Sequence, residues 1–363
     1  MKFIKFHLTL ALLLCATISF AEINVGVFLP FKASGATGKN AVEYYRGLLM
    51  AIDSLSQSGT TFKVTAADCG TTAADMSSLL NESKNGVYDI IFAPSNPQQA
   101  EVVKKYSLQN GIKVTMPFGG MYDELITNPN FYALKVTQTD YTIPAYNLIS
   151  KAFKDKKIVV VSTNDGAQIC PFANFIKKYS KGAKSLSWPA KESKILQAMA
   201  DPATIIVPSM YDEATQKAIM QLVHKAKSFN AVLIGYANWY DHTNSAAEAK
   251  ALGEANAYLI MQNYPRQDLP RIRKFMSAYE DNFDSRPAYD KFSITMWGFD
   301  TGYYLLKGVA RYKREFTNQK LYSAPLQSAF DFAPRSIGQG YINTHVLLLH
   351  YKPDGTQEII ESR

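Results

Sequence analysis

The sequence predicts an α/β protein built from two doubly wound lobes, each with a parallel sheet between layers of helices. Three observations predict this fold class. The chain has 363 residues, which at ~150 residues per domain suggests two units. Short apolar strands alternate with amphipathic helices, as in βαβ units. This alternation begins near Glu22 and starts again near Ile143 with no flexible linker between the runs, which favours two lobes that share a hinge.

In the first run, each predicted strand leads through a loop to a helix. The opening strand at 23–30 is apolar and stops at Pro30, and the helix at 41–56 has apolar residues at spacings of three and four. Gly59 closes that helix, as glycines commonly do at helix C-termini. The other predicted elements are strands at 62–67, 87–93 and 112–116 and helices at 73–84 and 97–109.

The second run repeats the pattern and then departs from it. Its strands are predicted at 157–162, 185–188, 204–207, 231–234 and 257–261, and its helices at 143–153, 172–181, 193–199 and 213–228. Two further helices follow at 269–282 and 293–312. Residues 341–350 alternate weakly, and Pro353-Asp354-Gly355 then predicts a hairpin turn into a strand at 358–360.

The first 21 residues predict a secretory signal peptide and a periplasmic location. Lys2 and Lys5 precede an uncharged apolar stretch, and Ser19-Phe20-Ala21 gives the small residues of a cleavage site. The apolar stretch is shorter than the ~20 residues of a transmembrane helix. The alternative is a lipoprotein leader acylated at Cys15.

The charge distribution bears on the kind of partner, and the cysteine content bears on disulfide bonding. The formal net charge is +8, to which Lys2 and Lys5 contribute, and the remaining basic residues form no block. Scattered charge and an export signal argue against a nucleic-acid partner. Beyond the leader, Cys69 and Cys170 remain. A disulfide between them would tie the lobes together, and we expect two unpaired thiols.

Candidate binding residues come from the loops that follow strands, because open α/β sheets bind ligands at the carboxyl ends of their strands. Several of these loops expose amide, hydroxyl or backbone N–H groups, and others carry aromatic rings, a combination that suits a small polar ligand with an apolar face. The candidates are Ser95, Asn96, Phe118, Gly119, Asn164, Asp165, Gln168, Tyr211, Tyr236, Trp239 and Tyr240.

Motifs for catalysis, cofactors and metals are weak. The segment 35–40 is too short between its glycines for a phosphate-binding loop, and Asn40 stands where Ser or Thr would hold magnesium. Asp300-Thr301-Gly302, the tripeptide of aspartic proteases, occurs once and within a helical pattern. Neither a G-x-S-x-G elbow nor a metal-ligand spacing is present in the sequence. We therefore expect a non-enzyme without cofactor or metal.

Several short sequence segments resemble those of type I periplasmic binding proteins, in particular the branched-chain amino acid (Leu/Ile/Val) receptor group of ABC transporters. They are the strand at 23–31 followed by VEYYRGLLMAIDSLSQSG at 42–59, VYDIIFAPS at 87–95, and FMSAYEDNFDSRP at 275–287 followed by 288–310. The closing HYKPDG at 350–355 resembles a Bacteroidetes-type subgroup. Members of that subgroup often carry a peptidoglycan-binding LysM module, which is not visible here.

The resemblance implies two lobes joined by three hinge crossings. Lobe one would combine 22–137 with 263–325, and lobe two 138–262 with 326–363. A small polar ligand, amino acid-like or other, would be enclosed by hinge motion for ABC-type uptake or sensing, with an inner-membrane permease as partner. Ser95, Phe118 and Gly119 would line lobe one. Asn164, Gln168, Tyr211 and Tyr236 would line lobe two.

One departure from the family concerns ligand charge. Amino acid receptors of this group hold the ligand ammonium with an acid after the late lobe-two strand, whereas residues 235–238 contain none. Asp165, Asp212 or Asp241 would have to substitute, because an unpaired ammonium in a closed cleft is costly. The alternative function is an envelope interaction protein that has lost its ligand and uses the fold as a protein-binding scaffold.

Overall fold

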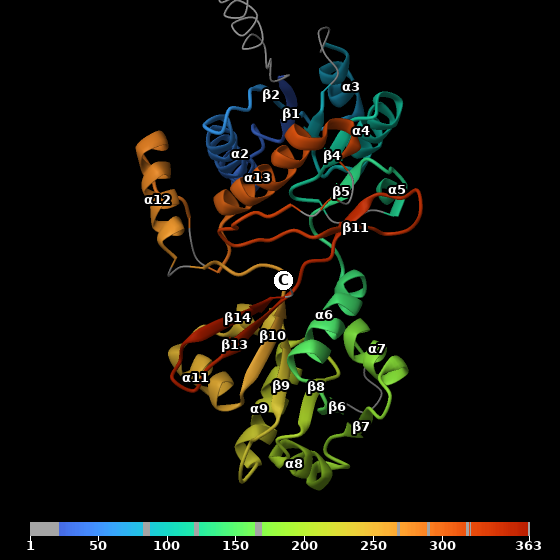
Figure 1. The fold of residues 1–363 in the computed structure, drawn as a ribbon, viewed down its shortest axis with the longest axis vertical. Helices are drawn as coiled ribbons and strands as arrows, with labels where there is room; N and C mark the ends of the chain where they lie inside the picture. The colour runs from blue at the N-terminus through green and yellow to red at the C-terminus, as the bar shows by residue number, and fades with distance from the viewer. Residues whose placement is uncertain are drawn as a thin grey trace, which may run out of the picture.

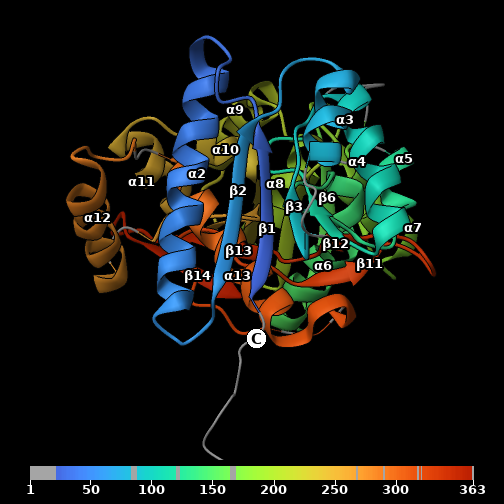
Figure 2. The same cartoon turned by 90° about the horizontal axis from the view of Figure 1, so that it is seen from above.

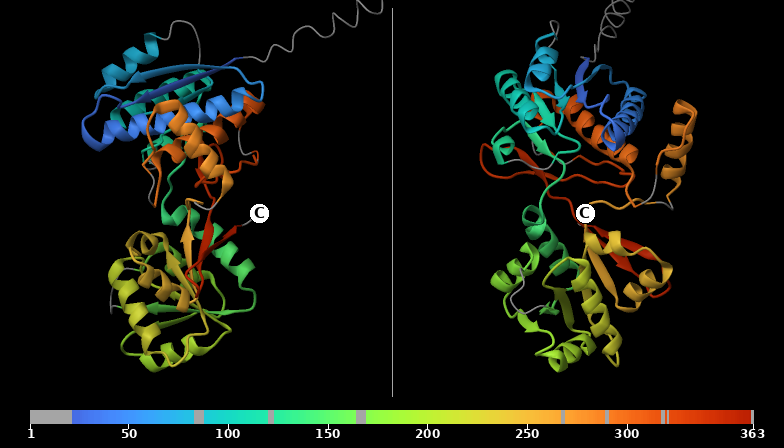
Figure 3. Two further views of the ribbon diagram at one scale, coloured as in Figure 1. Left: turned by 90° about the vertical axis from the view of Figure 1, so that its left-hand side faces the viewer. Right: turned by 180° about the vertical axis from the view of Figure 1, so that it is seen from behind.

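The computed structural model describes residues 22–82, 88–119, 123–163, 169–266, 269–288, 291–316, 319 and 321–361. Two lobes lie end to end, each built around a seven-stranded sheet (Figure 1). The segments that connect them run through the narrow zone between the lobes (Figure 3). The predicted α/β class with two doubly wound lobes is confirmed. No helix in the described ranges is both long and apolar enough to cross a membrane.

The sheet of lobe one is parallel except at one edge. Its strands follow the order β11 (Phe332–Pro334), β12 (Tyr341–Asn343), β5 (Phe131–Ala133), β4 (Lys113–Thr115), β3 (Ile90–Phe92), β1 (Ile23–Leu29) and β2 (Phe62–Asp68). Only β11 runs antiparallel to its neighbour. Six of the seven residues of β1 are buried, as expected for a strand covered by helices on both faces.

Helices cover both faces of this sheet. One core joins the sheet to α2 (Gly35–Ser56) and α13 (Ile294–Tyr312), and a second core joins its other face to α3 (Ala73–Glu82) and α4 (Pro97–Asn110). The short α5 (Asp123–Ile126) precedes β5, and α12 (Pro270–Phe283) projects beside the lobe (Figure 1). Figure 2 shows α2 running alongside β2 and β1.

Lobe two repeats the plan with a hairpin at its edge. Its strands follow the order β14 (Gln357–Glu361), β13 (Leu347–Tyr351), β10 (Ala257–Met261), β9 (Val232–Tyr236), β8 (Thr204–Pro208), β6 (Lys157–Ser162) and β7 (Lys184–Ser187). β13 and β14 are antiparallel additions to a parallel sheet. The flanking helices are α6 (Gln138–Ala152), α7 (Pro171–Tyr179), α8 (Glu192–Ala200), α9 (Glu213–Lys225), α10 (Ala237–His242) and α11 (Ala246–Glu254).

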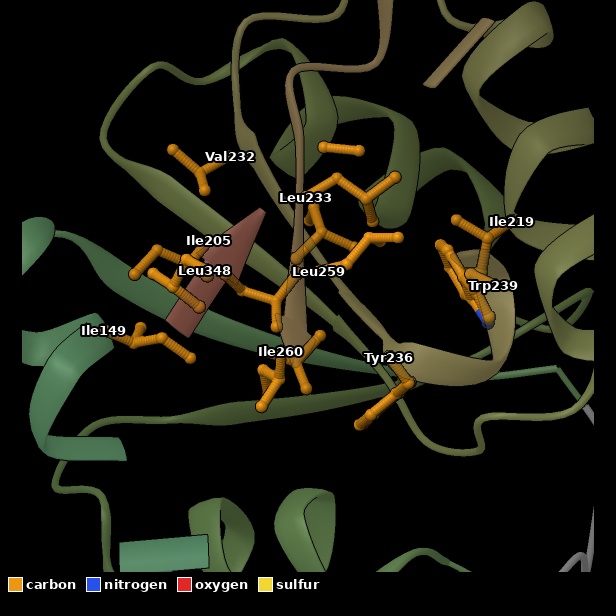
Figure 4. Close-up of a cluster of buried hydrophobic side chains, with 14 of the residues drawn as sticks. Ile149, Ile205, Ile219, Val232, Leu233, Tyr236, Trp239, Leu259, Ile260 and Leu348 are labelled. Carbon is orange, nitrogen blue, oxygen red and sulfur yellow. The ribbon is translucent and has the colours of Figure 1, made fainter. Parts of the chain in front are cut away.

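The core of lobe two is continuous from one sheet edge to the other. Ile205, Leu233, Leu259 and Leu348 project from four successive strands into one cluster (Figure 4). Ile205, Leu233 and Leu259 come from apolar runs that predicted strands, whereas Leu348 comes from the weakly alternating segment 341–350. The four strands occupy adjacent positions in the sheet. The hairpin predicted at 353–355 is present, with Gly355 at φ 83° in the turn.

The elements missed by the sequence patterns are short or lack a full apolar period. Among the described residues they are α5, β5, α10, α11, β11 and the short 3-10 helix η1 (Lys313–Glu315). Helix α6 begins at Gln138, before the predicted start at 143, because Asp140 caps its first turn. The Asp140 carboxylate accepts from the backbone N–H of Thr137 at 3.0 Å and from its hydroxyl at 2.6 Å.

The third boundary between the lobes differs from the expectation. The chain crosses at 134–137 and again between the end of β10 and the start of α12, and its third crossing lies at 344–346 rather than at 325–326. β11 and β12 therefore belong to lobe one, where β12 pairs with β5. Residues 341–350 alternate as one strand would, yet the chain is split between two sheets, and alternation does not reveal which sheet a strand joins.

Candidate functional site

A cavity of about 300 Å³ lies where the two lobes meet. Its walls include Lys135, which follows β5 of lobe one, and Ala237, which follows β9 of lobe two. Gln262 and Asn263 from the second crossing and Phe292 from the segment before α13 complete much of the lining. The carboxyl ends of strands from both sheets thus converge on one space, as expected for ligand sites of open α/β sheets.

The Gln262 amide is the least satisfied polar group of this cavity. Its Nε2 atom is buried and has no hydrogen-bond partner among the described residues. A buried donor without an acceptor costs about 1–3 kcal/mol. The lining thus includes a side chain whose amide hydrogen-bonding capacity the described residues do not use.

Lys291 connects the lobes at the wall of the cavity. Its ammonium donates to the carbonyl oxygens of Tyr240 at 2.9 Å and Asp241 at 2.6 Å, and to Oδ1 of Asn244 at 2.9 Å. It also lies 5.5 Å from the centroid of the Tyr240 ring. The two carbonyls belong to the C-terminal end of α10, which carries partial negative charge. Three protein acceptors therefore satisfy this ammonium, and it spans from lobe one to lobe two.

In lobe one the structure brings together three predicted site residues. A Cβ at Gly119 would lie 3.3 Å from Cβ of Ser95, so the loops after β3 and β4 touch. Phe118 is half-buried and packs edge-on against Tyr44, with ring centroids 5.4 Å apart. The indole N–H of Trp297 donates to the carbonyl of Pro117 at 3.0 Å, which fixes the end of β4.

Asn96 has a structural task. Its side-chain oxygen accepts from the backbone N–H groups of Gln98 at 2.9 Å and Gln99 at 3.4 Å, which caps α4. Its Nδ2 donates to the carbonyl of Thr71 at 3.3 Å. The Asn96 amide is thus committed to the fold, and the expectation that it binds ligand finds no support in this geometry.

Tyr236 and Trp239, also expected at the site, are core residues of lobe two (Figure 4). Tyr236 is 2% exposed and donates its hydroxyl to the carbonyl of Pro208 at 2.6 Å, while the Cys170 thiol donates to that hydroxyl at 3.2 Å. Trp239 is fully buried. An aromatic residue at a strand end points either into the core or toward the cleft, and both of these rings point into the core.

The other aromatic candidates of lobe two are accessible. Tyr211, in the loop after β8, is 38% exposed and meets the edge of Tyr236 with centroids 6.3 Å apart. Tyr240 is half-buried and lines the inter-lobe cavity. The expected residues Asn164, Asp165 and Gln168 lie outside the described residues.

Two of the three acids that could replace the missing family acid can be placed. Asp212 caps α9, because its carboxylate accepts from the Thr215 backbone N–H at 2.8 Å and from the Thr215 hydroxyl at 3.1 Å. Asp241 is exposed and lines the inter-lobe cavity. Asp165 is outside the described residues. Asp241 is therefore the described acid that lies at the cavity.

Sequence reasoning missed most of the residues that line the cavity: Lys135, Ala237, Met261, Gln262, Asn263, Lys291 and Phe292. Gln262 and Asn263 follow the predicted strand at 257–261, so the rule that selected the other loops would have selected them as well. Lys135 follows β5, which carried no recognisable strand pattern. Lys291 and Phe292 lie in an irregular segment, and no local signal marks them.

The remaining motifs have structural roles. Residues 35–40 form the first turns of α2 rather than a loop. Asp300 is buried in α13 and accepts three backbone N–H groups from 326–328. Cys69 and Cys170 are free and buried, so the expectation of unpaired thiols is confirmed. No cluster of His, Cys, Asp or Glu within the described ranges is arranged to hold a metal ion.

Comparison with known proteins gives matches among solved structures. No protein-family model matches the chain, and no curated protein matches it.

A protein assigned as a branched-chain amino acid ABC transporter of Rhodospirillum rubrum is 15% identical, with a TM-score of 0.63, over 93% of this chain and 100% of that one. A similarly assigned protein of Silicibacter pomeroyi is 12% identical, with a TM-score of 0.53, over 94% and 96%. An ABC transporter substrate-binding protein of Desulfitobacterium hafniense is 13% identical, with a TM-score of 0.51, over 93% and 100%. With two doubly wound lobes and three crossings between them, the chain has the fold of the type I periplasmic binding proteins.

Proposed function

We propose that the protein is a non-catalytic solute-binding protein that closes its two lobes on a small polar ligand, for ABC-type uptake or sensing in the periplasm. The observation that carries the proposal is the inter-lobe cavity with the buried, unpartnered amide of Gln262. The fold and the ABC transporter assignments of structurally similar proteins support it. The predicted signal peptide at 1–21, which lies outside the described residues, supports export.

Closure follows from the way the site is divided between the lobes. Lys135 and Phe292 line the inter-lobe cavity from lobe one, and Tyr240 and Asp241 line it from lobe two. Four of the expected residues stand at strand ends outside this lining: Ser95, Phe118, Gly119 and Tyr211. A ligand that contacts the lining of both lobes binds the closed arrangement more tightly than the open one, and this difference in affinity drives closure. The three crossings between the lobes are the segments that would absorb the rotation.

The cavity lining suggests the chemistry of the ligand. The Gln262 amide requires an acceptor oxygen, and the Asp241 carboxylate would accept hydrogen bonds from an ammonium or hydroxyl group. The Phe292 and Tyr240 rings provide an apolar wall. Because the Lys291 ammonium is already held by three protein acceptors, it adds little attraction for a ligand anion. A small molecule with an acceptor group, a donor group and an apolar part fits this lining.

A thermal-shift screen with amino acids, short peptides, sugars and nucleosides tests the function. Because a ligand that binds only the folded state stabilises it by RT ln(1 + [L]/Kd), about 2.7 kcal/mol at a hundredfold excess over Kd, we expect at least one compound to raise Tm. A flat response across the panel, together with co-purification of an envelope protein, would instead support the ligand-less scaffold.

Replacement of the Gln262 amide tests the site. Gln262→Leu removes the unpartnered donor at similar volume, so we expect the affinity for a ligand found in the screen to fall by about tenfold or more, with Tm of the free protein unchanged or raised. Isothermal titration calorimetry measures the affinity. Gln216→Leu is the matched control, because Gln216 also has a buried amide atom without a partner but lies on α9, outside the cavity lining. Equal affinities in the two variants would remove Gln262 from the site.

A further inference from the structure

A second and larger cavity lies beside the hinge, with a volume of about 760 Å³. It is bounded by the start of α11, by the β13–β14 hairpin and by the second crossing between the lobes. Tyr240 and Lys291 line both this hinge cavity and the inter-lobe cavity. We propose that the hinge cavity is a separate binding site for a small carboxylate with an apolar or aromatic body, and that its occupant influences the orientation of the lobes.

The size and the apolar walls of the hinge cavity fit a small organic molecule. Its volume falls within the ~300–1,000 Å³ typical of such sites. The rings of Tyr240, Tyr264 and Tyr351 contribute to the lining, together with Leu269 and Ile359. Tyr240 and Tyr264 meet edge to face, with centroids 5.7 Å apart, so their relative orientation is fixed before anything binds. Rigid aromatic walls favour a ligand with a flat or branched apolar part.

The charge of the lining favours a carboxylate over an amine. Among the lining residues that the structure describes, the charged ones are Arg266 and Lys291, both cationic. Arg266 forms an ion pair with Glu361 through Nη2, but its Nε atom is buried without a partner among the described residues. A ligand carboxylate that reaches the part of the guanidinium facing the cavity would accept a charge-assisted hydrogen bond from it. A ligand ammonium would meet no carboxylate in the described lining and would be costly to bury.

The N-terminus of α11 does not bind the ligand carboxylate. The Glu248 carboxylate already accepts from the backbone N–H groups of Asn244 at 2.8 Å and Ser245 at 2.9 Å, which caps the helix. Lys291 is likewise occupied by three protein acceptors. The Arg266 guanidinium is therefore the group left to recognise the carboxylate.

The position of Arg266 connects the hinge cavity to lobe movement. In the second crossing, the backbone N–H of Tyr264 donates to the carbonyl of Gln327 at 2.8 Å, and that of Arg266 to the carbonyl of Leu326 at 3.3 Å. An occupant that contacts Arg266, Tyr240 and Lys291 touches both the crossing and the lysine that spans the lobes. By linkage, its binding and inter-lobe ligand binding change each other by the same factor. This coupling rests on the proposed function, whereas the existence of the site does not.

Isothermal titration calorimetry of the full chain with phenylacetate tests the site, with phenylacetamide as the uncharged control. We expect saturable binding of phenylacetate that is about tenfold or more tighter than that of phenylacetamide. Arg266→Gln should abolish the preference for the charged compound. Ala249→Trp should abolish binding by filling the cavity, since Ala249 lines it. Lys250→Trp places the same bulk on α11 outside the lining and should bind as wild type does.

The outcomes separate this site from the inter-lobe site. Absence of saturable phenylacetate binding overturns the inference, as does binding that survives Ala249→Trp. Binding that is lost in Lys135→Ala but kept in Ala249→Trp would place phenylacetate in the inter-lobe cavity, which supports the proposed function and refutes the second site. Binding at the hinge cavity with no response to the ligand panel would support the second site and refute the proposed function.

Discussion

Asp300→Ala is expected to lower the free energy of unfolding by about 3–5 kcal/mol, because it removes the acceptor for three buried backbone N–H groups. Asp300 lies within α13 and is 3% exposed. Its carboxylate accepts from Leu326 at 2.8 Å, Gln327 at 2.9 Å and Ser328 at 2.8 Å. Urea unfolding measures the change. A loss below about 1 kcal/mol would show that these groups find other partners.

The same residue makes stability depend on pH. Burial raises the pKa of Asp300 from 3.8 to about 7, against the opposing effect of the three backbone N–H donors. A carboxyl whose pKa is higher in the folded state binds its proton more tightly there. The stabilisation that this proton gives the folded state is therefore complete below about pH 4 and is lost as the pH rises toward 7.

We expect wild-type stability to fall over this window relative to Asp300→Asn, which does not titrate. If the free energy of unfolding of the two proteins changed with pH in the same way, Asp300 would not be the source of the pH dependence.

Asp300 also supports the hinge. The segment that it holds, 326–328, accepts backbone hydrogen bonds from Tyr264 and Arg266 of the second crossing. Gln327 further anchors the segment, since its side chain accepts from the Ser293 N–H at 3.0 Å and donates to the Ser293 carbonyl at 2.8 Å. Loss of the carboxylate should therefore weaken the contacts of the second crossing with residues 326–328 as well as the packing of lobe one.

Gly298→Ala is expected to destabilise the protein by about 3 kcal/mol, at the upper end of the usual cost of overpacking. A Cβ at Gly298 would lie 2.0 Å from the carbonyl oxygen of Tyr44, and one at Gly47 would lie 1.9 Å from that of Thr295. α2 and α13 thus touch backbone to backbone, and no rotamer change relieves the clash. In an ordinary helix interior, Gly→Ala stabilises by about 0.5–1 kcal/mol, so the expected effect has the opposite sign.

Gly302→Ala is the graded control on the same helix. Its nearest neighbour would be Cδ1 of Leu48 at 2.5 Å, the end of a side chain that can rotate away. We expect a smaller loss of stability than for Gly298→Ala in thermal or urea unfolding. If Gly298→Ala proved as stable as the wild type, the two helices would be able to move apart at little cost in free energy.

Local patterns predicted most of the elements because they record which face of each element is apolar. The apolar run at 204–207 became β8, whose five residues are all buried, and the strand-end rule selected Ser95, Phe118 and Gly119, which the structure brings together. The pattern failed where an element is too short for a period, as in the three residues of β5. Without β5, neither Lys135 nor the partner of β12 could be identified.

The sequence alone determined the α/β class and the two lobes, whereas the structure shows that Cys69 and Cys170 are unpaired. Tertiary structure decided that the third crossing lies at 344–346, that Tyr236 and Trp239 point into the core, and that Lys291 spans the lobes. The physical reason is the range of the forces involved. Hydrophobic periodicity describes a single helix or strand. A cavity and its unpartnered groups, such as the Gln262 amide, arise only where chain segments distant in sequence meet.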